Sequence, residues 1–213
     1  MEKFTSIEIP EGVDVRGCVA KESSRYSIAG VLCGTVPVGN GEWAGLAVAT
    51  DGRTLSVTDC PVVVGSNHRG IVPTTLLPGK AGTRAGERNV RINGKAERDT
   101  RKGTISAELQ EGSFPPVLDV FPKEADVFDG DDYVCCAFNP DLLSQAVKAV
   151  TDVGSIAGHG EYAIYVHKGG KKPAVVIGQY GVALVMPITR PTTTATVRPM
   201  FAKMIARLAL MCK

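Results

Sequence analysis

The sequence has no hydrophobic run that approaches the length of a membrane span, and its first residues, MEKFTSIEIPEG, lack the apolar core of a signal peptide. Charge of one sign is also scarce, because the formal net charge of the 213 residues is +2. So small an excess creates no field that attracts nucleic acid over the whole surface. A DNA contact would need a local basic face or enclosure. We expect a cytoplasmic protein with no membrane partner.

Metal-binding and catalytic patterns are missing as well. None of the six cysteines forms a CxxC pair, and none of the three histidines stands at a zinc-ligand spacing from a cysteine. This favours buried free thiols in a reducing compartment. Asp51 and Asp59 flank a predicted hairpin without a partner base, and His159 lies between two glycines in a predicted loop. With no phosphate loop or nucleophile elbow either, we predict no enzymatic activity, no metal ion and no cofactor.

The sequence does contain a repeated order of predicted elements: a strand, a helix and three strands. The first unit has these elements at residues 4–9, 13–23, 25–34, 43–50 and 54–64. The second has them at 69–72, 73–77, 90–92, 95–98 and 104–110. The third has a strand at 133–138, a helix that begins at Asn139-Pro140, and strands at 162–166, 173–177 and 182–188. Three such βαβββ units form an internal repeat.

Two units make one domain, so we predict a complete domain at residues 1–122, an acidic linker at 123–132 and a half domain at 133–190. The fold class is α+β, with antiparallel sheets and few helices. The half domain must bury its apolar face against a partner chain or against the tail. Residues 191–213 are a threonine-rich connector and an amphipathic helix. The helix has methionines and Leu208 on one face and Lys203 and Arg207 on another, which favours a core-packing or oligomer helix; a membrane-surface helix is the alternative.

Three segments combine a strand with a turn. Residues 49–55, ATDGRTL, lie between apolar runs and predict a hairpin, with Asp51-Gly52 in the left-handed positions of a tight two-residue turn. The other two are LQEGSFPPVLDVFP at 109–122 and VALVMPITR at 182–190. Taken alone, they are ordinary turns and strand ends, and Leu55, Val120 and Leu184 are ordinary core residues.

These three segments resemble segments of one family, the bacterial β sliding clamp, where they have the forms A-T-D-G-H-R-L, G-R-F-P-D-Y-R-R-V-L-P and V-V-M-P-M-R. RYSIAGVLC at 25–33 and GIVPTTLL at 70–77 are similar to two further family segments, in the family's order. The resemblance covers residues 4–122 as the family's middle domain and 133–190 as half of its last domain. It implies a DNA-clamp fold built from βαβββ repeats.

The resemblance also implies a function in DNA replication. It predicts a processivity factor like the β subunit of DNA polymerase III: a homo-oligomer that encircles duplex DNA without reading its sequence and holds DNA polymerase and other clamp-motif peptides in an apolar pocket. Carried over residue by residue, the pocket comprises Thr50, Gly52, Arg53, Leu55, Pro115, Val120, Leu184, Met186 and Pro187. The candidate DNA-facing residues are Lys80, Arg84, Arg88 and Lys148, for which a solvated surface is the commoner explanation.

The sequence departs from the family pattern in several places. The family's first domain and half of its last domain have no counterpart, and the first two helices are poor. Arg53-Thr54 stands where the family has His-Arg, and residues 116–119 replace its Asp-Tyr-Arg-Arg. These departures support two alternatives: a clamp-fold protein-binding module that does not form a closed ring, or a structural subunit that reuses the fold.

Overall fold

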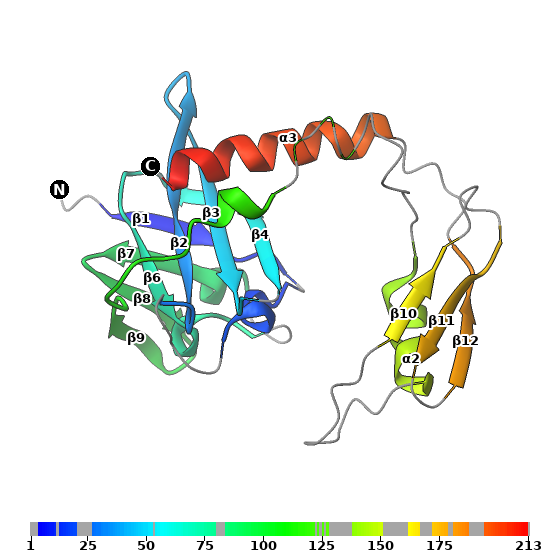
Figure 1. Cartoon of the computed structure of the whole chain (residues 1–213). Helices are drawn as coiled ribbons and strands as arrows, with labels where there is room; N and C mark the ends of the chain where they lie inside the picture. Colours follow the sequence, from blue (N-terminus) through cyan, green and yellow to red (C-terminus); the bar gives the residue numbers. More distant parts are fainter. Residues whose placement is uncertain are drawn as a thin grey trace. The chain divides into compact units, whose positions relative to one another are not determined.

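The computed structural model describes residues 4–11, 13–20, 27–52, 54–79, 84–121, 123, 125, 127, 138–150, 162–166, 172–178, 181–187 and 194–212. The chain divides into two compact units. Unit 1 comprises Met1–Phe121 and Phe201–Lys213, and unit 2 comprises Pro122–Met200. Figure 1 labels the α-helices of the described residues and all strands except β5.

Unit 1 contains two antiparallel sheets. The five-stranded sheet has the order β5-β1-β7-β8-β9, and the four-stranded sheet has the order β4-β3-β2-β6. The strands are Thr5–Glu8 (β1), Gly30–Gly39 (β2), Glu42–Thr50 (β3), Leu55–Cys60 (β4), Val62–Val64 (β5), Arg69–Pro73 (β6), Asn89–Asn93 (β7), Lys95–Thr100 (β8) and Gly103–Glu108 (β9). Four 3-10 helices lie between or after them: Val15–Cys18 (η1), Thr74–Leu76 (η2), Ala85–Arg88 (η3) and Val117–Val120 (η4).

The two repeats of unit 1 exchange their first strands. β1 begins the first repeat but pairs with β7 of the second, and β6 begins the second repeat but pairs with β2 of the first. The sheet of the first repeat therefore receives β6 from the second, and the sheet of the second repeat receives β1 and, paired with it, β5 from the first. Antiparallel sheets with two α-helices among the described residues confirm the predicted α+β class.

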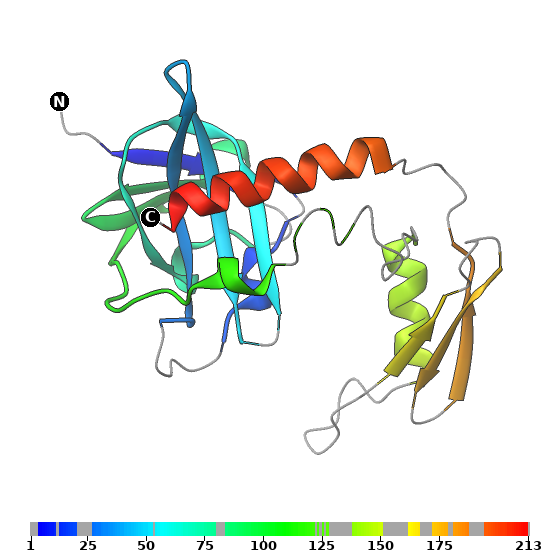
Figure 2. The same cartoon turned by 45° about the horizontal axis from the view of Figure 1, so that its top comes forward.

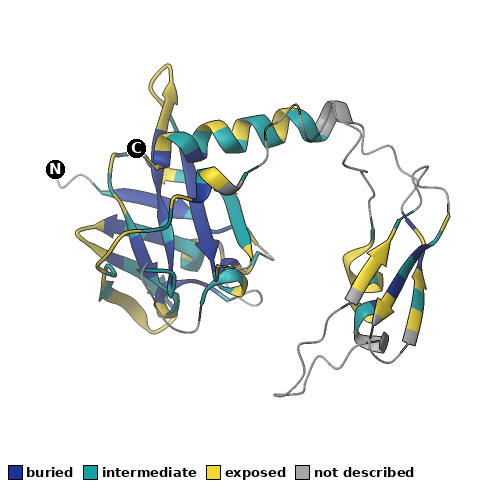
Figure 3. Cartoon of the chain, viewed as in Figure 1, coloured by how far each residue is buried: buried dark blue, intermediate teal, exposed yellow. Residues whose placement is uncertain are grey.

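β3 is buried on both faces, which explains why nearly all of its residues are apolar (Figure 3). Successive residues of a strand point to opposite faces. Ala47 and Ala49 lie in the core between the two sheets. Leu46 and Val48 lie in a second cluster on the other side of the four-stranded sheet, which we call its outer face.

The outer face of the four-stranded sheet is covered by helix α3 (Thr194–Met211), the last element of the chain. Figure 2 shows the C-terminal half of α3 crossing β2, β3 and β4 on the face that also carries η4. Leu208 and Met211 are fully buried there, and Met204 packs against the same cluster. The predicted core-packing helix is confirmed, although it begins four residues earlier than the expected 198. No helix of the described residues is long and apolar enough to cross a membrane.

Unit 2 contains one three-stranded antiparallel sheet and helix α2 (Pro140–Val150). Its strands are Tyr162–Tyr165 (β10), Ala174–Gly178 (β11) and Gly181–Val185 (β12). The predicted helix start is confirmed, because the Asn139 side-chain oxygen accepts a hydrogen bond of 2.9 Å from the backbone N–H of Asp141. Ala146 of α2 packs against Val176 and Val185 on one face of the sheet.

Two sequence-based predictions of unit 1 need correction. The helix expected at residues 13–23 is only the single 3-10 turn η1 among the described residues, because Gly17 and β-branched neighbours disfavour a longer helix. The single strand expected at 54–64 is divided at Pro61 into β4 and β5, which belong to different sheets. Proline has no N–H for a ladder, and the Pro61 carbonyl instead accepts a hydrogen bond from Glu8. The strand expected at 133–138 lies outside the described residues except for Phe138.

Candidate functional site

The first segment of the predicted pocket forms the hairpin between β3 and β4, but its turn is wider than predicted. Thr50 pairs with Leu55, so the loop has four residues, and Asp51 is not among the described residues with positive φ, whereas Gly52 has φ +85°. The Asp51 carboxylate accepts hydrogen bonds from the Thr54 backbone N–H (2.6 Å) and hydroxyl (2.9 Å). These bonds hold the wider loop closed without a left-handed residue at position 51.

The Thr50 hydroxyl fixes the same loop from within. It donates to the Thr54 carbonyl at 2.7 Å and accepts from the Gly52 N–H at 3.1 Å. Thr50 is buried, and Leu55 is half-buried at the start of β4. Arg53 lies outside the described residues. At this hairpin Gly52 is exposed to solvent, Thr50 is buried at the end of β3, and Leu55 packs against the apolar cluster on the outer face of the sheet.

The second segment lies against the first. Phe114, Val117 and Leu118 belong to the same apolar cluster as Leu55 and Val57. The structure thus brings two of the three predicted segments together on the outer face of the four-stranded sheet. Pro115 is half-buried beside this cluster, and Val120 is the last residue of η4, with its side chain outside the described part.

The third segment belongs to unit 2. Leu184 and Met186 point away from α2 and are 66% and 56% exposed, while Pro187 is buried. Exposed aliphatic and thioether side chains on a strand end suit the binding of apolar peptide anchors.

Helix α3 contributes residues that sequence reasoning did not connect with the hairpin. Lys203 and Arg207 both pair with the Asp59 carboxylate, with Lys203 Nζ 3.3 Å from Oδ2. The Arg69 guanidinium donates to the Met211 carbonyl, and Phe201 meets Phe121 edge to face at 6.4 Å. The four-residue spacing of Lys203 and Arg207 indicates that both cations lie on one face of the helix, but it does not indicate which acidic residue they pair with. Asp59 therefore pairs with two cations of α3, and Asp51 accepts hydrogen bonds from Thr54.

The predicted DNA-facing residues are not gathered in one described place. Arg84 is exposed, whereas Arg88 is largely buried and pairs with Glu8 at 2.7 Å. Lys80 and the side chain of Lys148 lie outside the described residues. Further basic residues of the second repeat also have acidic neighbours: Arg91 with Asp99, Lys95 with Glu97 and Arg101 with Glu87.

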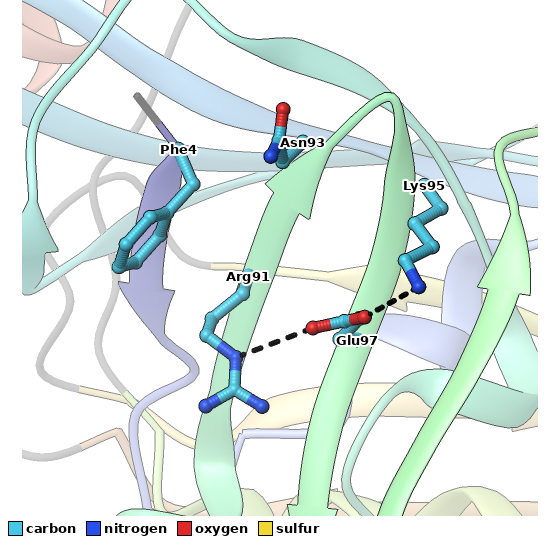
Figure 4. Close-up of a pocket in the computed structure, with 5 residues that line it drawn as sticks. All are labelled: Phe4, Arg91, Asn93, Lys95 and Glu97. Carbon is cyan, nitrogen blue, oxygen red and sulfur yellow. Dashed lines mark ion pairs between the residues drawn. The ribbon is translucent and has the colours of Figure 1, made fainter. Parts of the chain in front are cut away.

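A hollow of about 580 Å³ lies on the five-stranded sheet and is lined by none of the predicted site residues (Figure 4). It is lined by Phe4, Arg91, Asn93, Lys95 and Glu97. Arg91 also forms a two-bond fork with Asp99, with both N–H···O distances 2.9 Å. A hydrogen bond from Thr104 and this guanidinium hold the pKa of Asp99 below its usual range. The lining has two cations and one carboxylate, and Asp99 beside it supplies the second carboxylate, so each cation is paired with an acid.

Cys33 and Cys60 are buried as predicted, whereas Cys18 is half-buried and Cys212 is exposed. Burial raises the pKa of the Cys33 thiol well above its ordinary value. Burial, followed by the neighbouring Asp59 carboxylate, raises the pKa of Cys60 to about 12. Both thiols stay protonated and unreactive at neutral pH. Among the described residues, no three histidine, cysteine or acidic side chains are placed to hold a metal ion. His159 lies outside that part of the chain.

No protein-family model and no curated protein matches the sequence. Comparison with solved structures finds bacterial sliding clamps. The fold is similar to the Caulobacter crescentus β sliding clamp with polyethylene glycol bound (20% identity, TM-score 0.57), covering 81% of this chain and 46% of that one. The Pseudomonas aeruginosa DNA polymerase sliding clamp with ligand is 19% identical, with a TM-score of 0.55, and the match covers 89% of this chain and 52% of that one. The Bartonella birtlesii clamp bound to griselimycin is 16% identical, with a TM-score of 0.54, and the match covers 82% of this chain and 47% of that one. The chain spans about half the length of these clamps.

Proposed function

The chain has a divergent sliding-clamp-like fold, and we propose that it is a non-enzymatic processivity factor of cytoplasmic DNA replication. In this proposal a homo-oligomer encircles duplex DNA and tethers a DNA polymerase through short apolar peptides. The solved structures that the chain resembles include DNA polymerase clamps, and one has polyethylene glycol at a β-motif tethering region. The alternative is a clamp-fold module that binds a partner protein without closing a ring.

The observation that carries the proposal is the shared apolar cluster of the hairpin and η4. Leu55 of the hairpin and Leu118 of the proline-rich segment pack against one cluster, although more than sixty residues separate them. This supports the unit 1 part of the proposed pocket, Thr50, Gly52, Arg53, Leu55, Pro115 and Val120. The proposal also includes Leu184, Met186 and Pro187 of unit 2. Apolar walls with a few backbone polar groups suit the anchors of a clamp-motif peptide.

Peptide binding can be tested with a matched pair of methionines. Met186→Glu places a charge in the proposed pocket, and binding of a fluorescent clamp-motif peptide should weaken at least about tenfold. Met200→Glu changes a methionine of similar exposure on α3 and should leave the affinity unchanged. Equal affinity of the wild-type and Met186→Glu proteins would refute the pocket.

Ring closure requires several chains, because we propose that one chain supplies a complete clamp-like domain at residues 1–122 and a half domain at 133–190. A closed oligomer should thread onto linear duplex DNA through its free ends and stay there at high salt once the ends are blocked. Cutting the DNA should then release it. The open module predicts a monomer by light scattering and no difference between blocked and cut DNA.

DNA contact is proposed for Lys80, Arg84, Arg88 and Lys148, through phosphates rather than bases. Replacing Lys80 and Arg84 together by Ala should reduce the slope of log affinity against log salt by about 2, roughly one for each lost phosphate contact. Lys102→Ala, which removes an exposed cation outside this set, is the control and should leave the slope unchanged. An unchanged slope in the double variant would remove these residues from the proposal.

A further inference from the structure

In each repeat, η1, η2 or α2 packs on one side of the sheet, and we call the opposite side its outer face. The outer faces of the three repeats differ in chemistry. In unit 1, Val15 of η1 and Leu76 of η2 lie in the core between the sheets, and in unit 2 α2 packs on Val176 and Val185. The outer face of β7, β8 and β9 is polar. Its described residues include Arg91, Asn93, Lys95, Glu97, Asp99, Thr104 and Ser106.

The outer face of β2, β3 and β4 is apolar and covered. Leu46, Val48, Leu55 and Val57 share this face. Met204, Leu208 and Met211 of α3 pack against it, while the flanking Lys203 and Arg207 pair with Asp59 on the same face. An amphipathic helix with a methionine and leucine stripe is thus the natural cover for an apolar outer face in this fold.

The outer face of unit 2 is also apolar but bare among the described residues (Figure 3). Strand pairing places Ile177 beside Val182 and Val175 beside Leu184, all pointing away from α2. Tyr165 pairs with Val175 on the same face. Tyr165 and Val182 are each 63% exposed, and no described residue of the strands contributes a charge to this face. Such a contiguous apolar sheet face marks an interaction site.

We infer that the outer face of unit 2 binds an amphipathic helix of a partner protein, with methionine and leucine along its apolar side. The equivalent face of the first repeat is covered in this way by α3. The apolar side of the chain's own α3 is not available to bind this face, because its Leu208 and Met211 are buried in unit 1. The role of this face in partner recruitment rests on the proposed function, since Leu184 and Met186 belong to the proposed pocket too.

A fluorescent peptide with the sequence of residues 194–212 is the probe, because the first repeat already binds this helix. Titrated with the full chain, it should bind at least about tenfold more weakly to the Val182→Lys variant than to the wild type. Ser106→Lys puts the same charge on the polar outer face of the second repeat and should leave binding unchanged. Circular dichroism checks that both variants fold, as expected for exposed sites.

A second probe separates a helix from an extended peptide. α3 already contains Pro199 near its start. The same peptide with Ala206→Pro gains a second proline in the middle of the segment that carries Met204, Leu208 and Met211, which breaks the helix there, and it should lose binding although Ala206 is exposed in α3. Undiminished binding of the proline peptide, or equal binding by the Val182→Lys protein, would overturn the inference. So would a Val182→Lys change that dissociates a dimer but leaves peptide affinity intact, because the face would then hold a second copy.

A clamp-motif peptide measured in parallel distinguishes this inference from the proposed function. If the helical probe binds through Val182 and the clamp-motif peptide does not bind, the helix-binding face is supported and the proposed pocket is wrong. If the clamp-motif peptide binds through Met186 and the helical probe does not bind, the pocket is supported and the helix-binding face is wrong.

Discussion

Units 1 and 2 arrange the same kinds of element around different cores. In unit 1 two sheets pack on each other, and the helix position of each repeat is reduced to one turn, η1 or η2. In unit 2 that position holds α2, which has eleven residues and supplies the apolar cover of a single sheet. The comparison teaches that a full helix is dispensable in this repeat where a second sheet fills the core.

Removing the buried contact of α3 should destabilise unit 1 more than any other change considered below. Leu208→Ala removes a fully buried side chain from the outer cluster and should lower the free energy of unfolding by about 2–5 kcal/mol. Leu210→Ala, on the exposed side of the same helix, should cost much less. Urea unfolding of both variants measures the difference. Equal losses of unfolding free energy in the two variants would mean that the packing of Leu208 does not stabilise unit 1.

A smaller effect should be confined to unit 2. Asn139→Ala removes the side-chain cap of α2 and should destabilise that helix by about 1 kcal/mol. Hydrogen exchange should then quicken at the amides of α2, β11 and β12 and stay unchanged in β3 and β7. Faster exchange spreading into β3 would show that the units do not open independently. Asn139→Asp keeps an oxygen acceptor and serves as the control.

Local chemistry made parts of this structure predictable. Asn40 and Gly41 both have positive φ, as the sequence Gly-Asn-Gly requires of a tight turn. The start of α2 was predictable from Asn139-Pro140, because asparagine caps a helix and proline suits its first position. The hairpin and the proline-rich segment were placed at one site by resemblance, because no periodicity relates them.

Long-range features were not predictable from the sequence. The exchange of β1 and β6 between sheets depends on how two similar repeats fit together, and nothing local distinguishes it from pairing within each repeat. The division of the strand at Pro61 follows from that exchange, since β5 pairs with β1. The partner of Lys203 and Arg207 lies more than 140 residues away, at Asp59.

The next prediction concerns that ion pair. Asp59→Asn removes the carboxylate that two cations of α3 share, and should destabilise the helix contact by about 0.5–1 kcal/mol, because the pair is partly exposed. High salt should reduce the difference between wild type and variant, since it screens the wild-type attraction. Asp119→Asn, at an exposed acid of η4 that has no ion pair in the described part, is the control. A loss independent of salt would point to packing instead.

The smallest effect lies on the polar outer face of the second repeat, in contrast with the apolar faces. The pKa of Asp99 is lowered by Thr104 and then by Arg91, so the folded state favours its ionised form. Its contribution to stability is therefore present above the unfolded-state pKa and is lost as pH falls through the lower folded-state pKa, below about pH 4. Asp99→Asn should lower the melting temperature slightly at pH 7, and this difference should shrink as the pH falls below about 4. A difference of equal size at neutral and at low pH would show that the stabilising effect of this side chain does not depend on its charge.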